Sequence, residues 1–263
     1  MRSMKLTPSF FSLAGNRRKG RIVRAGRARI YYEVYGRGKP LLLLHGGLSC
    51  IDGLRHQIPF FARRFKVYLP ERPGHGHTAD ISGPYTYEAM ASQTAAFMDA
   101  LRIKKALLMG YSDGANLLFR LALRRPDLVD RFISVGGNIH HSGCEPSFQR
   151  ELKKQKVSGV DPRYEAYSPD DPAHFYEVFE KCRRLWLTEP KWNMGMLKKI
   201  KAPVLIVAGD RDMIRHEHSV RMFRALKNAQ LAIVPGASHA ALKEKPGLLN
   251  KIMLEFFTGR AVL

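Results

Sequence analysis

A serine, a carboxylate and a histidine that could pass a proton between them stand far apart along this chain of 263 residues. The serine is Ser112, and its five-residue surroundings fit the pattern Gly-x-Ser-x-Gly. A serine hydroxyl is a poor nucleophile until a base takes its proton, and a histidine can take that proton and later return it to a leaving group. The chain order Ser112, Asp212, His239 therefore suggests acyl-transfer chemistry, in which the carboxylate fixes the imidazole tautomer.

The surroundings of Ser112 matter because Gly-x-Ser-x-Gly alone also arises by chance. An apolar run over 106–109 precedes the motif, and a helical pattern over 115–123 follows it. This context predicts a sharp strand-to-helix turn that lifts the serine off a sheet. Small residues at both ends suit a backbone that passes close to its neighbours. The alternative is a solvated serine in an ordinary turn.

Backbone donors for a developing negative charge are expected in two places. His45, Gly46 and Gly47 follow the apolar run 41–44, and a glycine there lets a backbone N–H face a bound oxygen. We expect the N–H groups of Gly47 and Asp113 to form an oxyanion hole, with Leu48 as the alternative to Gly47. Alone, the His-Gly-Gly stretch is equally typical of a plain tight turn.

The remaining two groups follow later apolar runs. Two acids, Asp210 and Asp212, come after the run 204–208, and His239 comes after the run 231–234. Catalytic groups at strand ends can converge on one edge of a sheet while the scaffold holds them in place. The two acids are therefore competing candidates for the same role.

The elements that must position these residues alternate along the chain. Short, purely apolar runs are typical of strands buried on both faces, and helical patterns over 87–101, 115–123 and 248–257 separate most of them. This alternation predicts an α/β fold with a parallel sheet and helices on both faces. The rhythm breaks from Asn138 to about Ile200, where helical candidates over 148–156 and 172–187 indicate an insertion that could cover the sheet edge as a lid.

Taken in order, the motifs resemble those of the α/β-hydrolase fold family in its serine-nucleophile, lid-bearing branch. The resemblance covers nearly the whole chain after about Lys19, although Glu71 stands where an Asp and Thr78 where a Ser is commoner. The motifs that carry it are His45-Gly46-Gly47, Gly74-His75-Gly76-His77-Thr78, Gly110-Tyr111-Ser112-Asp113-Gly114, Gly209-Asp210-Arg211-Asp212 and Gly236-Ala237-Ser238-His239.

The resemblance implies an eight-stranded, mostly parallel sheet with a helical lid inserted after the sixth strand. We therefore expect a basic N-terminal extension over 1–19, a core over 20–137 and 201–263, and a lid over 138–200. It also implies that the acid stands three residues after the glycine, which favours Asp212 and leaves Asp210 to the turn. Relatives that hydrolyse epoxides or alkyl halides use Asp at the elbow, so Ser112 disfavours both activities.

Three residues are candidates for substrate binding. Asp113 is unusual beside a nucleophile, and the Ser-Asp-Gly elbow looks like that of relatives that cleave amino-acid esters, so its carboxylate could pair with a substrate ammonium. The alternative is that Asp113 lends only its N–H and turns its side chain to the helix N-terminus or to a nearby Arg. Trp186 and Trp192 in the lid are expected to pack onto the core, and one or both could line the acyl pocket.

Charge and cysteine content set the expectations for partners. Lys and Arg exceed Asp and Glu by 44 to 23, a net charge of +21, and the first 30 residues hold nine basic residues and no acid. This surplus favours an anionic contact such as a membrane surface, but no nucleic-acid motif with interleaved aromatics appears, so nucleic acid is not expected. The three cysteines and the lack of a long apolar run fit a cytoplasmic protein, peripheral membrane contact included.

No metal or cofactor is expected. The cysteines show no CxxC or Cys/His pairing, and His216 and His218 stand at i and i+2, which do not share a helical face, so a solvated helix start is favoured there. The leading hypothesis is a serine hydrolase that cleaves a small or medium carboxylic ester through an acyl-enzyme. Lactonase, thioesterase, C–C hydrolase, aminopeptidase and perhydrolase activities share this constellation. A ligand-binding or anionic-surface-binding protein on a hydrolase scaffold is the hypothesis from another class.

Overall fold

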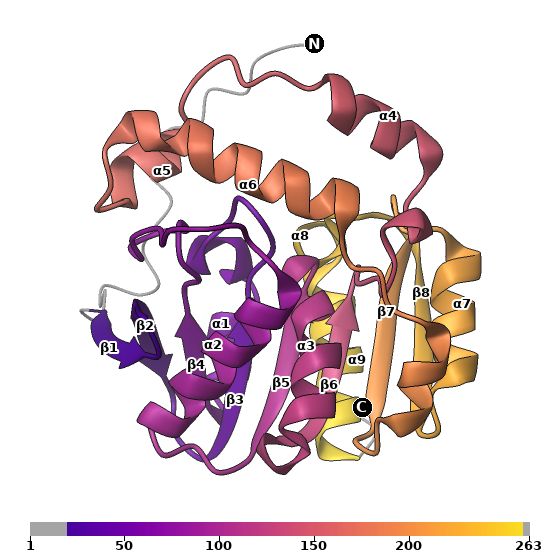
Figure 1. Cartoon of the computed structure of the whole chain (residues 1–263). Helices are drawn as coiled ribbons and strands as arrows, with labels where there is room; N and C mark the ends of the chain where they lie inside the picture. The colour runs from indigo at the N-terminus through magenta and orange to yellow at the C-terminus, as the bar shows by residue number, and fades with distance from the viewer. Residues whose placement is uncertain (1–19, 260–263) are drawn as a thin grey trace.

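A single eight-stranded sheet organises the computed structural model of the chain, which describes residues 20–259 (Figure 1). The strand order is β1-β2-β4-β3-β5-β6-β7-β8, and only the β1–β2 and β2–β4 pairs are antiparallel. The strands are β1 (Arg21–Ala25), β2 (Ala28–Tyr35), β3 (Lys39–Leu44), β4 (Phe65–Pro70), β5 (Ala106–Tyr111), β6 (Val129–Val135), β7 (Val204–Arg211) and β8 (Ala229–Ser238). The predicted mostly parallel, eight-stranded α/β fold is confirmed.

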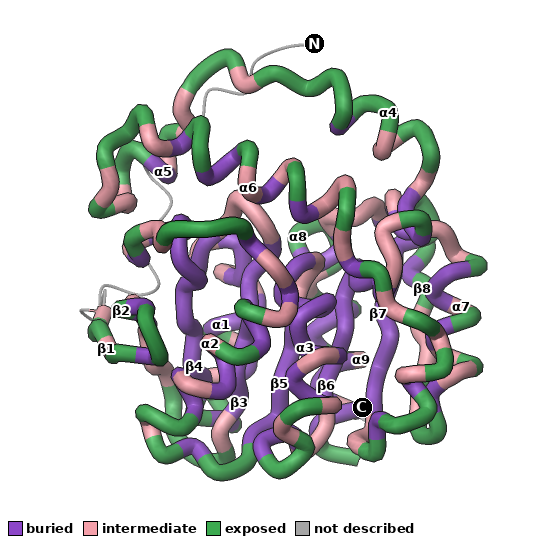
Figure 2. Tube along the Cα trace, viewed as in Figure 1, coloured by how far each residue is buried: buried purple, intermediate pink, exposed green. Residues whose placement is uncertain are grey.

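Helices cover both faces of the sheet, which is why the middle strands are apolar throughout. Side chains alternate between the faces of a strand, so in β3 Leu42 and Leu44 belong to one core and Leu41 and Leu43 to the other. The first core packs under α2 (Tyr87–Ala100), α3 (Asp113–Arg124) and α7 (His216–Ala225). The second packs under α1 (Ile58–Phe61), α8 (Ala241–Glu244) and α9 (Pro246–Thr258). Figure 2 shows these middle strands buried.

The segment between β6 and β7 carries helices that lie above the sheet in Figure 1. We call residues 138–200 the inserted segment. Its helices are α4 (Pro146–Lys154), α5 (Pro162–Tyr167) and α6 (Phe175–Thr188), with shorter 3-10 turns between them. Helix α6 packs by one face, which contributes Phe175, Val178, Cys182 and Leu185 to the core beneath, whereas α4 is mostly exposed (Figure 2).

The observed bounds differ from those predicted by a few residues at several elements. Helix α3 begins at Asp113 rather than Ala115, and α6 begins at Phe175 rather than Pro172. Helix α5 was not predicted, because only six residues form it. Strands β7 and β8 run on to Arg211 and Ser238, since their pairing continues past a register shift between Gly209 and Arg211. The predicted basic extension over 1–19 lies outside the described residues, and no helix among residues 20–259 is long and apolar enough to cross a bilayer.

Candidate active site

Ser112 sits in the sharp turn that joins β5 to α3. Its backbone has φ 55° and ψ −117°, a strained conformation for a residue with a side chain. A Cβ on Gly110 would lie closer than 3.0 Å to the backbone of Gly114, and a Cβ on Gly114 would meet the carbonyl of Leu44 at 2.5 Å. Both glycines of the motif are therefore required by close backbone approach, as the sequence predicted.

The structure brings Ser112, His239 and Asp212 into one hydrogen-bonded chain. The Oγ of Ser112 lies 3.0 Å from His239 Nε2, and His239 Nδ1 lies 2.8 Å from Asp212 Oδ1. A carboxylate facing Nδ1 keeps the proton on that nitrogen, so Nε2 presents its lone pair to the serine hydroxyl. Asp212 and His239 are each the first residue after a strand, β7 and β8, which explains how residues so far apart in sequence converge.

The two competing acids have different partners. Asp212 is buried at 8% exposure, and its Oδ1 also accepts a hydrogen bond from the N–H of Ile214 at 3.0 Å. Asp210 is exposed, and its Oδ1 accepts from the N–H of Ala237 at 3.0 Å in the neighbouring strand. The geometry therefore assigns Asp212 to the histidine and Asp210 to the β7–β8 pairing. The ring of Tyr111 packs against the ring of His239, with ring centroids 5.3 Å apart.

The N–H groups of Gly47 and Asp113 are available to a bound oxygen. Within residues 20–259, neither of these groups donates a hydrogen bond to another part of the chain. Asp113 is the first residue of α3, where backbone N–H groups have no partner inside the helix and favour negative charge. Leu48, the alternative donor, has a left-handed φ of 45° and accepts from Arg163 through its carbonyl.

Arg72 fixes the peptide that carries the Gly47 N–H. Its guanidinium is buried and donates to the carbonyls of His45 and Gly46, the latter at 2.8 Å. The Gly46 carbonyl and the Gly47 N–H belong to one planar trans peptide and point in opposite directions. Because Arg72 holds the carbonyl, the N–H is turned away from Arg72 and held there. Burial lowers the pKa of Arg72, while the Asp113 carboxylate acts in the opposite direction.

The Asp113 side chain is buried and held by two different elements. Its Oδ1 accepts hydrogen bonds from the Tyr87 hydroxyl of α2 at 2.8 Å and from Trp186 Nε1 of α6 at 2.9 Å. Burial, and next the Asp113 charge, raise the pKa of Tyr87 well above 10, so this hydroxyl stays a donor. The other carboxylate oxygen of Asp113, Oδ2, has no hydrogen-bond partner within residues 20–259 and lies 4.0 Å from Arg72 Nη2. Asp113 thus faces an Arg through Oδ2, as one of the two alternatives predicted, although that oxygen accepts no hydrogen bond within residues 20–259.

A cavity of about 180 Å³ opens above Ser112. The residues that line it include the apolar Phe148, Met213 and Ile214 and the polar Asn116, Asn138 and Glu189. Trp186 and Asp113 line it as well, in line with the sequence prediction.

Trp192 is not among the residues that line the cavity, so of the two tryptophans named as candidates for the acyl pocket the structure places only Trp186 there. Its ring packs edge-on against Tyr87, with ring centroids 5.9 Å apart, and it belongs to the core beneath α2. Asn116 and Asn138 form a reciprocal pair: Asn116 Nδ2 donates to Asn138 Oδ1 at 2.8 Å, and the Asn138 N–H donates to Asn116 Oδ1 at 2.7 Å.

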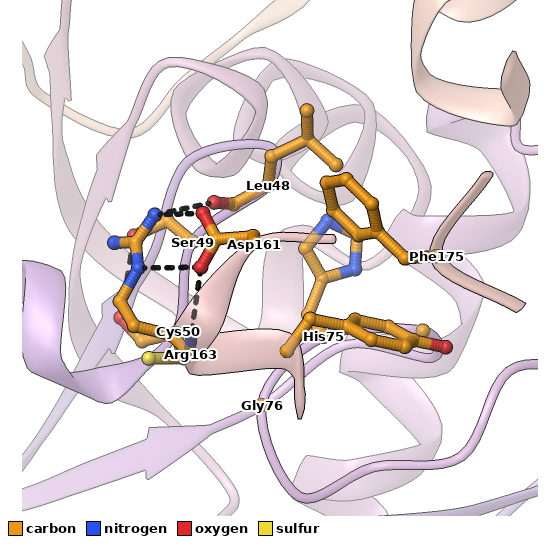
Figure 3. Close-up of a pocket in the computed structure, with 10 residues that line it drawn as sticks. Leu48, Ser49, Cys50, His75, Gly76, Asp161, Arg163 and Phe175 are labelled. Carbon is orange, nitrogen blue, oxygen red and sulfur yellow. Dashed lines mark hydrogen bonds and ion pairs between the residues drawn. The ribbon is translucent and has the colours of Figure 1, made fainter. Parts of the chain in front are cut away.

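A second and much smaller cavity, of about 20 Å³, lies where the inserted segment meets the turn after β3 (Figure 3). Arg163 pairs with Asp161 at 2.8 Å and reaches the carbonyl of Leu48 at 3.4 Å. The volume of this second cavity is close to that of one water molecule. We interpret it as a contact that docks the inserted segment rather than a substrate site.

Metal-type side chains gather in one place within residues 20–259, at Asp80, His174 and Glu177. Lys181 Nζ already lies there, 2.6 Å from Asp80 Oδ2 and 2.9 Å from Glu177 Oε1, so a cation is built into the cluster. His218 is buried rather than solvated, contrary to our expectation, because its Nε2 accepts the N–H of Ile139 at 3.2 Å. Burial lowers the pKa of His218 to about 4.

Sequence reasoning missed Arg72, Tyr87 and Glu189 as parts of this site. Arg72 lies between Glu71 and the motif over 74–78, both of which were considered, but Arg72 itself was not. Tyr87 begins a helix that was predicted for its apolar face alone. Nothing in the local pattern around Glu189 indicated that its carboxylate would accept the N–H of Tyr87 at 3.1 Å and line the cavity.

Comparison with known proteins identifies the family. The sequence profile of the α/β hydrolase fold matches residues 39–164. A meta-cleavage product hydrolase from Pseudomonas fluorescens IP01 (CumD) has a similar structure, with a TM-score of 0.76 and 25% identity over 91% of this chain and 98% of that one. This chain belongs to the α/β-hydrolase fold family. Its class is therefore that of a hydrolase.

Related sequences are named for different substrates. A protein of Caulobacter sp. (strain K31), provisionally named the carbamate hydrolase RutD, is 27% identical over 88% of this chain and 97% of its own length. The 2-hydroxy-6-oxo-2,4-heptadienoate hydrolase of Pseudomonas putida (strain F1) is 26% identical over 84% of this chain and 89% of its own length. Because such relatives differ in substrate, the substrate of this α/β hydrolase must be argued from its own cavity.

Proposed function

We propose that this α/β hydrolase cleaves a small or medium carboxylic ester through an acyl-enzyme formed on Ser112. The observation that carries the proposal is the unbroken chain from Asp212 through His239 to the serine hydroxyl, beside two backbone N–H groups without partners. His239 Nε2 takes the hydroxyl proton as Oγ attacks the ester carbonyl. The N–H groups of Gly47 and Asp113 hold the oxyanion of the tetrahedral intermediate.

The same groups then complete the cycle. When the intermediate collapses, the C–O bond to the alcohol breaks and the imidazolium of His239 gives its proton to the leaving oxygen. Water enters, His239 takes its proton, and the hydroxide attacks the acyl carbonyl. The second intermediate expels Ser112 Oγ, which recovers its proton from His239, and the carboxylic acid leaves.

The cavity supports a short acyl group. Its volume of about 180 Å³ is only slightly above that of an apolar cavity that admits benzene, roughly 150 Å³. Its apolar lining residues, among them Phe148, Met213 and Ile214, suit a hydrocarbon chain.

The charged residues that line the cavity favour a neutral or positively charged substrate. Asp113 and Glu189 contribute carboxylates to the lining, and no Lys or Arg of the described chain lines it. Asp113 Oδ2 has no hydrogen-bond partner and can accept one from an ammonium group. This supports a preference for α-amino esters, and equal kcat/KM for amino esters and their des-amino analogues would remove it. The lining also disfavours a substrate with a free carboxylate, such as the dienoate for which the Pseudomonas putida relative is named.

The decisive experiment is the Ser112→Ala variant. It is expected to abolish turnover of short p-nitrophenyl esters and labelling by a fluorophosphonate, because no other described side chain is paired with His239 Nε2. The fold of the variant is checked by circular dichroism and thermal unfolding. Hydrolysis at the wild-type rate by the variant would falsify the assignment.

A second candidate role, contact with an anionic bilayer, is supported by the β1–β2 hairpin. Arg24 and Arg29 are direct cross-strand partners, an arrangement of like charges that is unfavourable unless an anion is nearby. Arg21 and Arg27 flank them, none of the four pairs with an acid within the described residues, and Ile22 is 57% exposed beside them.

Co-sedimentation with phosphatidylglycerol-containing vesicles at low salt tests this contact, with pure phosphatidylcholine vesicles as reference. We expect the double variant Arg24→Gln/Arg29→Gln to weaken binding more than Lys198→Gln/Lys199→Gln, which removes the same charge elsewhere. Equal binding by both double variants, or binding to duplex DNA instead of vesicles, would refute a bilayer contact at the hairpin.

A further inference from the structure

Trp186 touches both residues whose N–H groups form the proposed oxyanion hole. Its Nε1 donates to Asp113 Oδ1 at 2.9 Å. A Cβ placed on Gly47 would lie closer than 3.0 Å to Trp186 Cζ2, so the indole ring lies directly against the Gly47 backbone. One side chain of the inserted segment therefore contacts the oxyanion-hole residue after β3 and the one at the start of α3.

We propose that Trp186 is a positioning residue through which docking of α6 completes the oxyanion hole. The proposal rests on the acyl-transfer function above and adds a requirement to it: the two N–H donors are correctly placed only while α6 lies on the core. Such donors act because they are held in place before charge develops, and a displacement of about 1 Å at reacting groups costs roughly 10²-fold in rate.

The contact at Asp113 matters because this carboxylate has few partners. Within residues 20–259, only Tyr87 and Trp186 donate to Oδ1, and Oδ2 accepts from neither. Tyr87 belongs to α2 of the core, so Trp186 supplies the one donor that depends on the inserted segment. The loss of a hydrogen-bond donor to a buried carboxylate costs free energy, and the carboxylate then moves toward its remaining partners.

Arg72 links that movement to the other donor. Its Nη2 lies 4.0 Å from Asp113 Oδ2 and also donates to the Gly46 carbonyl at 2.8 Å. A shift of the carboxylate toward Arg72 therefore acts on the peptide whose other end is the Gly47 N–H. Removal of the indole also uncovers Gly47 directly, so both donors lose support at once.

A general loosening of α6 is the competing explanation, and the same helix offers a control for it. Lys181, one and a half turns before Trp186, fastens α6 to the core through Asp80 Oδ2 at 2.6 Å. Neither residue of that pair lines the cavity above Ser112. Lys181→Gln thus removes a charge-assisted contact between α6 and the core without touching the oxyanion hole.

The first experiment compares Trp186→Phe, which keeps an aromatic ring but removes the N–H, with Lys181→Gln. We expect Trp186→Phe to lower kcat for a short p-nitrophenyl ester about tenfold, with KM within about threefold, as the loss of one hydrogen bond to a charged group implies. The rate of fluorophosphonate labelling should fall in parallel. Lys181→Gln should keep both rates within about twofold. Equal losses in the two variants, or wild-type rates in Trp186→Phe, would overturn the proposal.

A second measurement uses the fact that the chain has two tryptophans. Trp192→Phe leaves Trp186 as the sole indole fluorophore, and acrylamide quenching then reports how well α6 covers it. A boronic acid that forms a tetrahedral adduct with Ser112 should reduce quenching relative to the same variant without the adduct. Unchanged or increased quenching would contradict the coupling.

The two levels of inference fail in different ways. A wild-type chain that neither hydrolyses esters nor reacts with fluorophosphonate disproves the proposed function itself. A wild-type chain that does both, while Trp186→Phe matches it, disproves only the role of Trp186. Thermal unfolding of Trp186→Phe and Lys181→Gln separates a change in rate from a loss of folded protein, and the fluorescence experiment needs no substitution at Trp186.

Discussion

Gly47→Ala is the smallest change that tests the oxyanion hole. The φ of Gly47 is not left-handed, so alanine can adopt the backbone conformation without strain. What opposes the substitution is space. The added Cβ would lie closer than 3.0 Å to Asp113 Oδ2 and to Trp186 Cζ2, whereas ordinary contact begins at 3.4 Å.

The size of the effect follows from what must move. Trp186 can retreat only by stretching its 2.9 Å hydrogen bond to Asp113, and Asp113 is also held by Tyr87. The turn that carries the Gly47 N–H is therefore expected to shift as well. Loss of one oxyanion donor costs roughly 10²–10³-fold in kcat, or about 2.7–4 kcal/mol, so we expect a fall of about 10²-fold with a smaller change in KM.

Steady-state kinetics with a short p-nitrophenyl ester measure this fall. Gly247→Ala is the matched control, because a Cβ there meets nothing within 4 Å and Gly247 lies in α9, away from the cavity. It should leave kcat unchanged. If Gly47→Ala keeps kcat within about threefold of the wild type while remaining folded, the Gly47 N–H is not an oxyanion donor, and Leu48 becomes the candidate.

Three other substitutions test further parts of the structure. Asp212→Asn should lower kcat about 10⁴-fold and Asp210→Asn less than threefold. The reverse ranking in steady-state assays would show that Asp210, not Asp212, is the acid that orients the histidine. The pKa of His218 is lowered to about 4, so its own contribution to folding stability is unfavourable below pH 6.5 and reaches a loss of about 3 kcal/mol as the pH drops to 4. His218→Asn should reduce this loss in urea titrations at the two pH values, and an identical loss would contradict it. Arg72→Lys should lower kcat about tenfold, because lysine cannot hold two carbonyls as a fork; wild-type kcat would show that the clamp is unnecessary.

The sheet could be predicted because its strands carry their own signal. Runs such as 41–44 and 204–208 are apolar on both faces, a pattern that only strands covered by helices on both sides require. The extension of β7 and β8 past Gly209 carried no such signal. It depends on pairing across a register shift, and residues such as Asp210 and Ser238 are polar there.

The candidate site likewise contains residues that the sequence could predict and residues that it could not. Ser112, Asp212 and His239 could be found because each follows an apolar run at a strand end, and parallel strands bring those ends together. Tyr87 and Glu189 could not, because their roles depend on which side chains from distant elements meet over Ser112. Trp192 was weighed equally with Trp186 since both stand in the inserted segment, yet only the one on α6 faces the cavity.

The net charge of +21 illustrates why a chain-wide number does not describe its site. In the described residues the basic side chains lie mainly on the surface, where salt screens their fields within about 8 Å. The cavity has Asp113 and Glu189 in its lining and no Lys or Arg, and the positive charge of Arg72 behind Asp113 is engaged with two carbonyls. Interactions between buried groups are screened far less than those on the surface. The charged side chains that line the cavity above Ser112 within residues 20–259 include two carboxylates and no Lys or Arg, although the net charge of the protein is positive, so specificity at this site depends on a few local carboxylates.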